Sequence, residues 1–115
     1  MERKQTKEAP VTRGLPHEHP GKLLKDVVIP AVNEQGTSTS KVAELLGISR
    51  PQLYDIMNEK KPISAQMAQR FGKLFGNGPE LWMELQTRYD LALAKAELGE
   101  ALDRIPTLPP AAVAA

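Results

Sequence analysis

The apolar side chains between residues 19 and 104 recur with the 3.6-residue period of an α-helix, and glycines and prolines divide this run into short segments. No stretch alternates apolar and polar residues in the way that a half-buried strand does. Each helix of this kind has a single apolar stripe, so several of them must pack around one shared core. The sequence therefore predicts an all-α domain.

The size and composition of the chain exclude several classes of protein. A chain of 115 residues has room for one small domain, which excludes a two-domain enzyme. Because it contains no cysteine, it can form no disulfide framework, cysteine-ligated metal centre or thiolate nucleophile, and we expect a reducing, cytoplasmic location. No apolar run reaches the roughly 18 to 20 residues that span a bilayer, so we expect no membrane association.

The two ends of the chain differ from the helical region between them. Residues 1–18 are rich in charged residues and poor in large apolar ones, which predicts a flexible N-terminal arm. Residues 105–115 are rich in proline and alanine, and their prolines prevent a helix from continuing, which predicts a tail. The domain is therefore expected at residues 19–104, with an extended last helix that reaches about Arg104.

Five helices are expected, and the first two are set by glycine, proline and serine. The first begins after Pro20-Gly21, and Pro30 is expected to end or kink it near Ile29. Its apolar stripe comprises Leu23, Leu24, Val27, Val28 and Ala31. The second helix follows Ser38, a residue suited to cap a helix N-terminus, and stops at Gly47. Its inward-facing residues are expected to be Val42, Ala43, Leu45 and Leu46.

The remaining three helices have similar start and stop signals. The third begins at Ser49 or Arg50 and runs to about Asn58. The fourth follows Ser64 and ends at Gly76, and its wide apolar face predicts a central position. The fifth opens with Pro79, which is well tolerated in a first turn.

Residues 38–61 have the pattern of a helix-turn-helix, in which the second helix enters the DNA major groove. Ala43 is small where the two helices cross, and Gly47 allows the sharp turn between them. The apolar residues that fix the angle between the helices are Val42, Leu46, Ile48, Leu53 and Ile56. The polar residues of the second helix are left on the outward side.

Those outward side chains have the chemistry of base readers. Arg50 can donate two bonds to guanine, Gln52 can pair with adenine, and Asp55 can accept from cytosine. Tyr54 is placed on the same side.

Other polar residues suit the phosphates of double-stranded operator DNA. Thr39 and Ser40 lie in a first helical turn, where hydroxyls and the positive end of the helix dipole favour a phosphate oxygen, and Lys60 and Lys61 follow the reading helix. The net charge of the chain is only +1, so we expect two copies to bind a palindromic site.

Motifs inside and outside the helix-turn-helix point together to one family. These are His19-Pro20-Gly21, the segment A-E-L-L-G-I-S-R at 43–50, Asn58-Glu59-Lys60, Ile63-Ser64-Ala65, Pro79-Glu80-Leu81-Trp82, Leu85-Gln86 and Tyr89-Asp90-Leu91. Together, over about residues 16–93, they resemble HigA-type antitoxins of the Xre and lambda-repressor-like helix-turn-helix superfamily.

The resemblance implies a five-helix, homodimeric repressor without catalytic residues, metal or cofactor. Such a protein binds the operator of its own operon and neutralises a HigB-type toxin, a ribosome-dependent mRNA endonuclease of the RelE kind. Carried over to this sequence, the resemblance implies phosphate contacts at Ser38, Thr39 and Lys60. It implies groove contacts for the outward residues of the reading helix, namely Arg50, Gln52, Tyr54 and Asp55, beside Ser49.

Three positions depart from the family pattern. Thr39 stands where glutamine is common and has a shorter reach. Pro51 makes Ser49 and Arg50 compete for the N-cap position. Glu59 stands where glycine is usual, which leaves Asn58 as the expected left-handed residue.

Two other functions are consistent with the same helix pair. The protein could be a stand-alone Xre-type repressor, or a protein-interaction module in which the helix pair is only scaffold. His17 and His19 with Glu18 lack the third and fourth fixed ligands of a metal site. Neither histidine is expected in the core to activate a nucleophile, which argues against an enzyme.

An apolar stripe continues along the last helix beyond the shared motifs. It comprises Leu91, Ala94, Leu98, Leu102 and Ile105. An exposed stripe of this kind favours a protein partner, and we expect it to form the homodimer interface.

Overall fold

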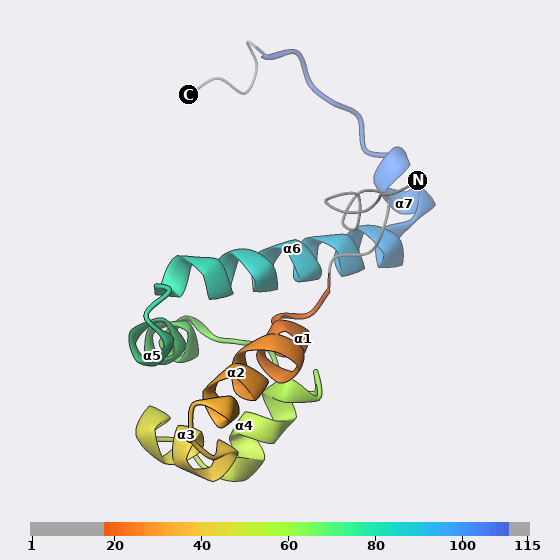
Figure 1. The fold of residues 1–115 in the computed structure, drawn as a ribbon. Helices are drawn as coiled ribbons and strands as arrows, with labels where there is room; N and C mark the ends of the chain where they lie inside the picture. The colour runs from red at the N-terminus through yellow and green to blue at the C-terminus, as the bar shows by residue number, and fades with distance from the viewer. Residues whose placement is uncertain (1–17, 111–115) are drawn as a thin grey trace, which may run out of the picture.

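The computed structural model describes residues 18–110, and every regular element in that range is helical (Figure 1). The chain runs through α1 (Pro20–Leu23), η2 (Leu24–Val28), α2 (Ile29–Glu34), α3 (Thr39–Leu46), α4 (Arg50–Met57), α5 (Ala65–Phe75), α6 (Pro79–Leu98) and α7 (Glu100–Asp103). The predicted all-α class is confirmed. The predicted arm, apart from Glu18, and the end of the predicted tail lie outside the described residues.

The core forms where α5 and α6 pack together and where the first helix packs on α6 and α4, with α6 lying across the top of this group in Figure 1. Trp82 is fully buried, with its ring edge-to-face on Phe71 at 5.1 Å between centroids. Its indole N–H donates to Asn77 Oδ1 at 3.0 Å, so burial of the ring leaves no polar atom without a partner. Leu24, from the first helix, and Leu53, from α4, are fully buried members of the same core.

A buried glutamine connects the last long helix to the loop that follows α4. Gln86 Oε1 accepts from the backbone N–H of Ile63 at 2.7 Å, and Gln86 Nε2 donates to Asp90 Oδ1 at 3.0 Å. A buried amide with both ends paired stabilises a fixed geometry, because an unpaired N–H at Ile63 would cost about 1–3 kcal/mol. The loop between α4 and α5 is thereby held against α6.

Pro30 does not end the first helix, so of the two outcomes predicted there, an end or a kink, the end is wrong. α1, η2 and α2 form one continuous helical run to Glu34, and the middle segment has π-helical pairing, with the Ile29 N–H donating to the Leu24 carbonyl. A wider π turn relieves the clash between a proline ring and the carbonyl four residues earlier. The extra residue also shifts the inward face, so that Ile29 is buried while Val27 and Ala31 are exposed.

The last helix is also shorter than predicted. α6 ends at Leu98, and Gly99 has φ 53° and ψ −126°, a conformation that is open to glycine alone among common residues. The chain turns there into the single-turn α7. The prediction of a continuous helix to about Arg104 was therefore wrong, because the backbone leaves the helical conformation at Gly99. None of the described helices combines the length and apolar character needed to cross a membrane.

Candidate nucleic-acid interface

α3, the turn at Gly47 and α4 form the predicted helix-turn-helix. Gly47 has φ 76°, and the backbone N–H of Ile48 donates to the Ala43 carbonyl at 3.1 Å, which closes α3 and starts the turn. Of the residues expected to lock the pair, Val42, Leu46, Leu53 and Ile56 are buried, and Ile48 is only half-buried against the same core. Ala43, the small residue expected at the crossing, is buried as well. The angle between the two helices is thus fixed by apolar packing on one side and by backbone bonds on the other.

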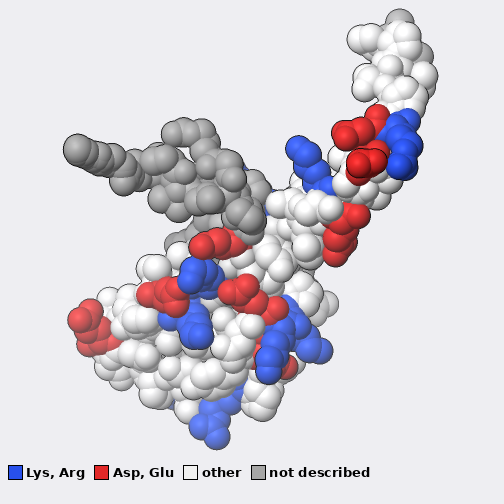
Figure 2. Space-filling model, turned by 90° about the vertical axis from the view of Figure 1, so that its right-hand side faces the viewer, with Lys and Arg blue, Asp and Glu red and all other residues white. Residues whose placement is uncertain are grey.

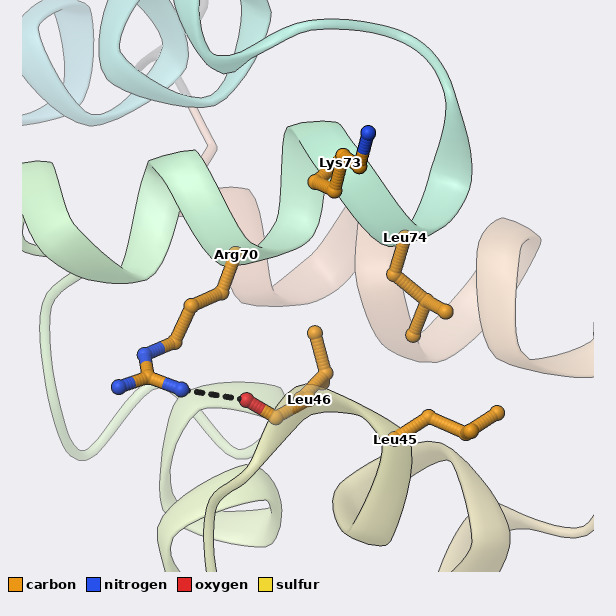
Figure 3. Close-up of a pocket in the computed structure, with 5 residues that line it drawn as sticks. All are labelled: Leu45, Leu46, Arg70, Lys73 and Leu74. Carbon is orange, nitrogen blue, oxygen red and sulfur yellow. Dashed lines mark hydrogen bonds between the residues drawn. The ribbon is translucent and has the colours of Figure 1, made fainter.

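A side chain from α5 also stabilises the turn at Gly47. Arg70 Nη1 donates to the Leu46 carbonyl at 2.7 Å, so it satisfies one of the last acceptors of α3 (Figure 3). The sequence does not indicate this role for Arg70, because an arginine on a helix face is usually solvated. Only the packing of α5 against α3 gives it this role.

Leu45 was expected to face inward, and this was wrong. Its side chain is 53% exposed and lines an open cavity of about 260 Å³ together with Leu74 and Lys73 (Figure 3). α3 is only eight residues long, and Val42, Ala43 and Leu46 already fill the faces that meet α4 and α5. Leu45 lies at the edge of that stripe.

The start of α4 is fixed by a reciprocal cap. Ser49 Oγ accepts from the Gln52 backbone N–H at 3.2 Å, and Gln52 Oε1 accepts from the Ser49 backbone N–H at 2.8 Å. This capping box makes Ser49 the N-cap and places Arg50 and Pro51 in the first turn. The competition between Ser49 and Arg50 is thereby decided for Ser49.

The structure brings two predicted site residues from different helices together. Arg50 Nη1, in the first turn of α4, donates to Ser40 Oγ, in the first turn of α3, at 3.1 Å. The guanidinium carries five N–H donors, so this bond holds its direction and leaves the other donors for a ligand. The N-terminal end of α4 and the first turn of α3 therefore share one surface.

The other predicted contacts surround this pair. Ser38 caps α3 by accepting from the Lys41 N–H at 3.1 Å, and Thr39, next to it, is half-buried with its hydroxyl 3.5 Å from Asn33 Nδ2. Tyr54 is exposed and Asp55 half-buried on α4. The exposed Lys60 and Lys61 are held near α4 because their N–H groups donate to the Asp55 carbonyl, at 2.8 and 3.3 Å.

The turn that ends α4 corrects a further prediction. Glu59, not Asn58, is left-handed, with φ 63°, while Asn58 has φ −94° as the C-cap residue. The chain reverses one residue later than expected because Asn58 still donates to the Tyr54 carbonyl at 2.8 Å. A side chain in this conformation costs about 1–2 kcal/mol, so the turn must be held by the contacts around it.

Charge on the molecule is mixed and not gathered by sign. Figure 2 shows Lys and Arg side chains interspersed with Asp and Glu over one face of the molecule. The ion pairs among residues 18–110 join neighbours on single helices, for example Lys41 with Glu44 at 3.6 Å. Affinity for a polyanion would have to come from a few local contacts, in line with the net charge of +1.

Comparison with known proteins agrees with this geometry. A helix-turn-helix family model matches residues 31–82. Virulence-associated protein I of Dichelobacter nodosus is 30% identical over 83 residues, which cover 72% of this chain and 74% of that protein. Virulence-associated protein A′ of the same organism is 39% identical over 75 residues, and the match spans 64% of this chain and 62% of that protein's length.

Solved structures decide the family. The Pseudomonas aeruginosa antitoxin HigA, solved with the higBA promoter, is 36% identical with a TM-score of 0.70, covering 81% of this chain and 99% of that one. Antitoxin GraA in complex with its operator is 30% identical with a TM-score of 0.71, covering 91% and 99%. This chain belongs to the HigA-type antitoxin family.

The H-P-G opening of this HigA-type protein positions the C-terminal end of α4. A Cβ on Gly21 would lie 1.8 Å from the Ile56 carbonyl oxygen, so only glycine lets α1 approach α4 this closely. His19 caps α1: its Nδ1 accepts from the Gly21 N–H at 2.9 Å, and its ring packs edge-to-face on Tyr89 at 5.0 Å. The expectation that neither histidine lies in the core is wrong for His19, while His17 lies outside the described residues.

Burial lowers the pKa of His19, since the charged ring loses hydration. Nearby Glu59 and Asp90 and a hydrogen bond to the Lys61 backbone act in the opposite direction without cancelling the shift. Below pH 6.5 the unfolded chain therefore binds a proton at His19 more readily than the folded chain does. The stability contributed by the neutral ring is complete above that pH and is lost as the pH falls toward the lowered value.

We expect the unfolding free energy to drop between pH 7.5 and 5.5, and to drop less in His19→Asn, because asparagine caps a helix without titrating there. Urea unfolding of both proteins at the two pH values measures this difference. His17 is present in both proteins, so its titration cancels. Equal drops in the two proteins would show that His19 does not carry the effect.

Proposed function

We propose that this HigA-type protein is the operator-binding autorepressor of a type II toxin–antitoxin system. The observation that carries the proposal is the exposed first turn of α4, in which Ser49, Arg50 and Gln52 are held in place by caps and by Ser40. A reading helix that is rigid and uncovered has lost its conformational freedom before it meets a ligand. The operator and promoter complexes of its structural relatives support DNA as that ligand.

In the proposed complex the N-terminal turn of α4 lies in the major groove. Arg50, Gln52, Tyr54 and Asp55 face base edges, and the first turn of α3 places the hydroxyls of its N-terminus on the phosphate backbone. Lys60 and Lys61 contact the next phosphates. The bond between Arg50 and Ser40 links base reading to backbone contact, because the two residues share one surface.

The apolar stripe near the end of α6 is the proposed homodimer interface. Leu91 is 66% exposed and Leu98 48% exposed, with Ala94 between them on the same helix face. Leu102 and Ile105 follow after the turn at Gly99 and are also exposed. A stripe of this kind is costly in water, and a second copy would both bury it and supply the second half-site.

The proposed protein partner is a HigB-type toxin, an mRNA endonuclease that the antitoxin neutralises by binding in the cytoplasm. The proposal rests on family membership, since the related Coxiella burnetii protein is an addiction module antidote of the HigA family. The antitoxin is proposed to act without catalysis: His19 serves as a helix cap, and its Nδ1 is engaged by the Gly21 N–H.

A mobility-shift assay with DNA from upstream of the gene tests the DNA-binding proposal. We expect Arg50→Ala to lose about 1–3 kcal/mol on operator DNA and little on random DNA, because it removes a base contact. Lys60→Ala should weaken both kinds of DNA alike and reduce the salt slope by about 1. Lys25→Ala, an exposed lysine on the first helix, is the matched control. Equal losses for Arg50→Ala on both DNAs would contradict its role.

Sedimentation of the full-length protein tests the interface. We expect Leu98→Asp to weaken the dimer at least tenfold, because a carboxylate buried without a partner costs more than about 1.4 kcal/mol. Leu45→Asp is the matched control, since Leu45 is similarly exposed but lies on α3. A dimer that is unchanged by Leu98→Asp would remove this stripe as the interface.

Co-purification with the product of the neighbouring reading frame tests the antitoxin role. We expect a stable complex that stops ribosome-dependent mRNA cleavage by that product. Operator binding without any complex would instead identify a stand-alone Xre-type repressor. The absence of both operator binding and complex formation would favour a protein-interaction module.

A further inference from the structure

The ring of His19 is buried, and both of its nitrogens have a hydrogen-bond partner. Nδ1 accepts from the Gly21 N–H at 2.9 Å, so the neutral ring carries its proton on Nε2. The ring makes a second hydrogen bond, to the backbone of Lys61. Because Nε2–H is the donor that remains, the acceptor is the Lys61 carbonyl oxygen. One side chain therefore connects the start of α1 with the segment that follows α4.

That segment carries the two lysines proposed to contact phosphates. The N–H groups of Lys60 and Lys61 donate to the Asp55 carbonyl at 2.8 and 3.3 Å, which holds one side of the segment to α4. Glu59, just before them, has a left-handed backbone with φ 63°, which a residue with a Cβ adopts at a cost. Such a turn persists where surrounding contacts hold it. The bond from His19 holds the other side of the segment, at the Lys61 carbonyl.

The position of His19 is itself fixed by the core. The residue is 5% exposed, and its ring packs edge-to-face on Tyr89 of α6 at 5.0 Å between centroids. Gly21, its hydrogen-bond partner, lies against the Ile56 carbonyl with no room for a Cβ, so the start of α1 cannot slide along α4. The Lys61 carbonyl is therefore bonded to a group that α1, α4 and α6 hold in place.

We propose that His19 is a positioning residue for DNA binding, whose Nε2–H fixes the backbone from which Lys60 and Lys61 reach the phosphates. The proposal rests on the operator binding proposed above. A lysine on a fixed backbone has less freedom to lose when it binds than one on a mobile loop. Phosphate contacts carry no sequence information, so His19 affects the affinity for all DNA alike and leaves the preference for the operator unchanged.

Two substitutions separate the two hydrogen bonds of the ring. Asparagine places Oδ1 where histidine has Nδ1, so His19→Asn keeps the cap on α1 but its shorter side chain does not reach the Lys61 carbonyl. Glutamine places its amide N–H₂ near the position of Nε2, so His19→Gln keeps a donor for Lys61 and loses the Nδ1 acceptor.

Binding of full-length protein to operator and random duplexes over a range of salt concentrations tests the proposal. We expect His19→Asn to lower the salt slope by about 1 to 2, because each phosphate contact contributes about 0.9 to the slope. It should weaken binding to both duplexes by the same factor. His19→Gln should retain the slope of the unaltered protein.

Ser64→Ala is the matched control for loss of a helix cap away from the lysines. Ser64 Oγ accepts from the Met67 N–H at 3.1 Å at the start of α5, so its removal should lower stability and leave the salt slope unchanged. Circular dichroism at the assay temperature checks that every variant is folded.

A double-substitution cycle tests whether His19 acts through the lysines. In a protein that carries Lys60→Ala and Lys61→Ala, we expect His19→Asn to cause no further loss of DNA affinity, because the side chains that it positions are absent. A further loss of the same size in that background would overturn the proposal.

An unchanged salt slope in His19→Asn, or equal losses of slope in His19→Asn and His19→Gln, would also overturn this inference while leaving operator binding intact. So would a changed ratio of operator to random affinity in His19→Asn. Failure of the unaltered protein to bind either duplex would overturn the DNA-binding proposal and this inference with it.

Discussion

The crossing of α3 and α4 depends on the turn at Gly47, and the rest of the interface depends on that crossing. The turn is held from three directions: the left-handed backbone of Gly47, the buried contacts of Leu46 and Leu53, and the bond from Arg70 on α5 to the Leu46 carbonyl. Because α5 packs on α6, the turn is coupled to the Trp82 core. A change in the angle between α3 and α4 would therefore shift all the polar side chains of α4 at once and would also disturb the core.

The polar residues of the interface also organise one another. Ser49 and Gln52 satisfy each other's backbone groups, and Arg50 bonds to Ser40 on the other helix. These bonds lie at the surface, so each adds little to the free energy of unfolding, but together they narrow the directions in which donors point. For a protein with a net charge of +1, such direction matters more than bulk attraction to a polyanion.

Most of the fold could be predicted because helix periodicity and capping act over a few residues. Ser38 and Ser64 cap helices where their hydroxyls indicated, and Gly76 ends α5. The wrong predictions concern places where residues close in sequence favour different structures. The π segment before Pro30 was not predicted, because the apolar stripe favours a continued helix while proline favours an end. The left-handed turn at Glu59 was not predicted, because asparagine adopts that conformation more readily than glutamate.

The sequence by itself determined that the domain is all-α, where most of its helices begin, and that Ser38 and Ser64 cap two of them, because periodicity and capping depend on side chains three or four positions apart. Only the tertiary structure decided that Leu45 faces solvent, that His19 is buried, and that Gln86 bonds to Ile63, which is 23 positions away. Such contacts depend on the angles and distances between helices, and those are set by the packing of the whole core at once.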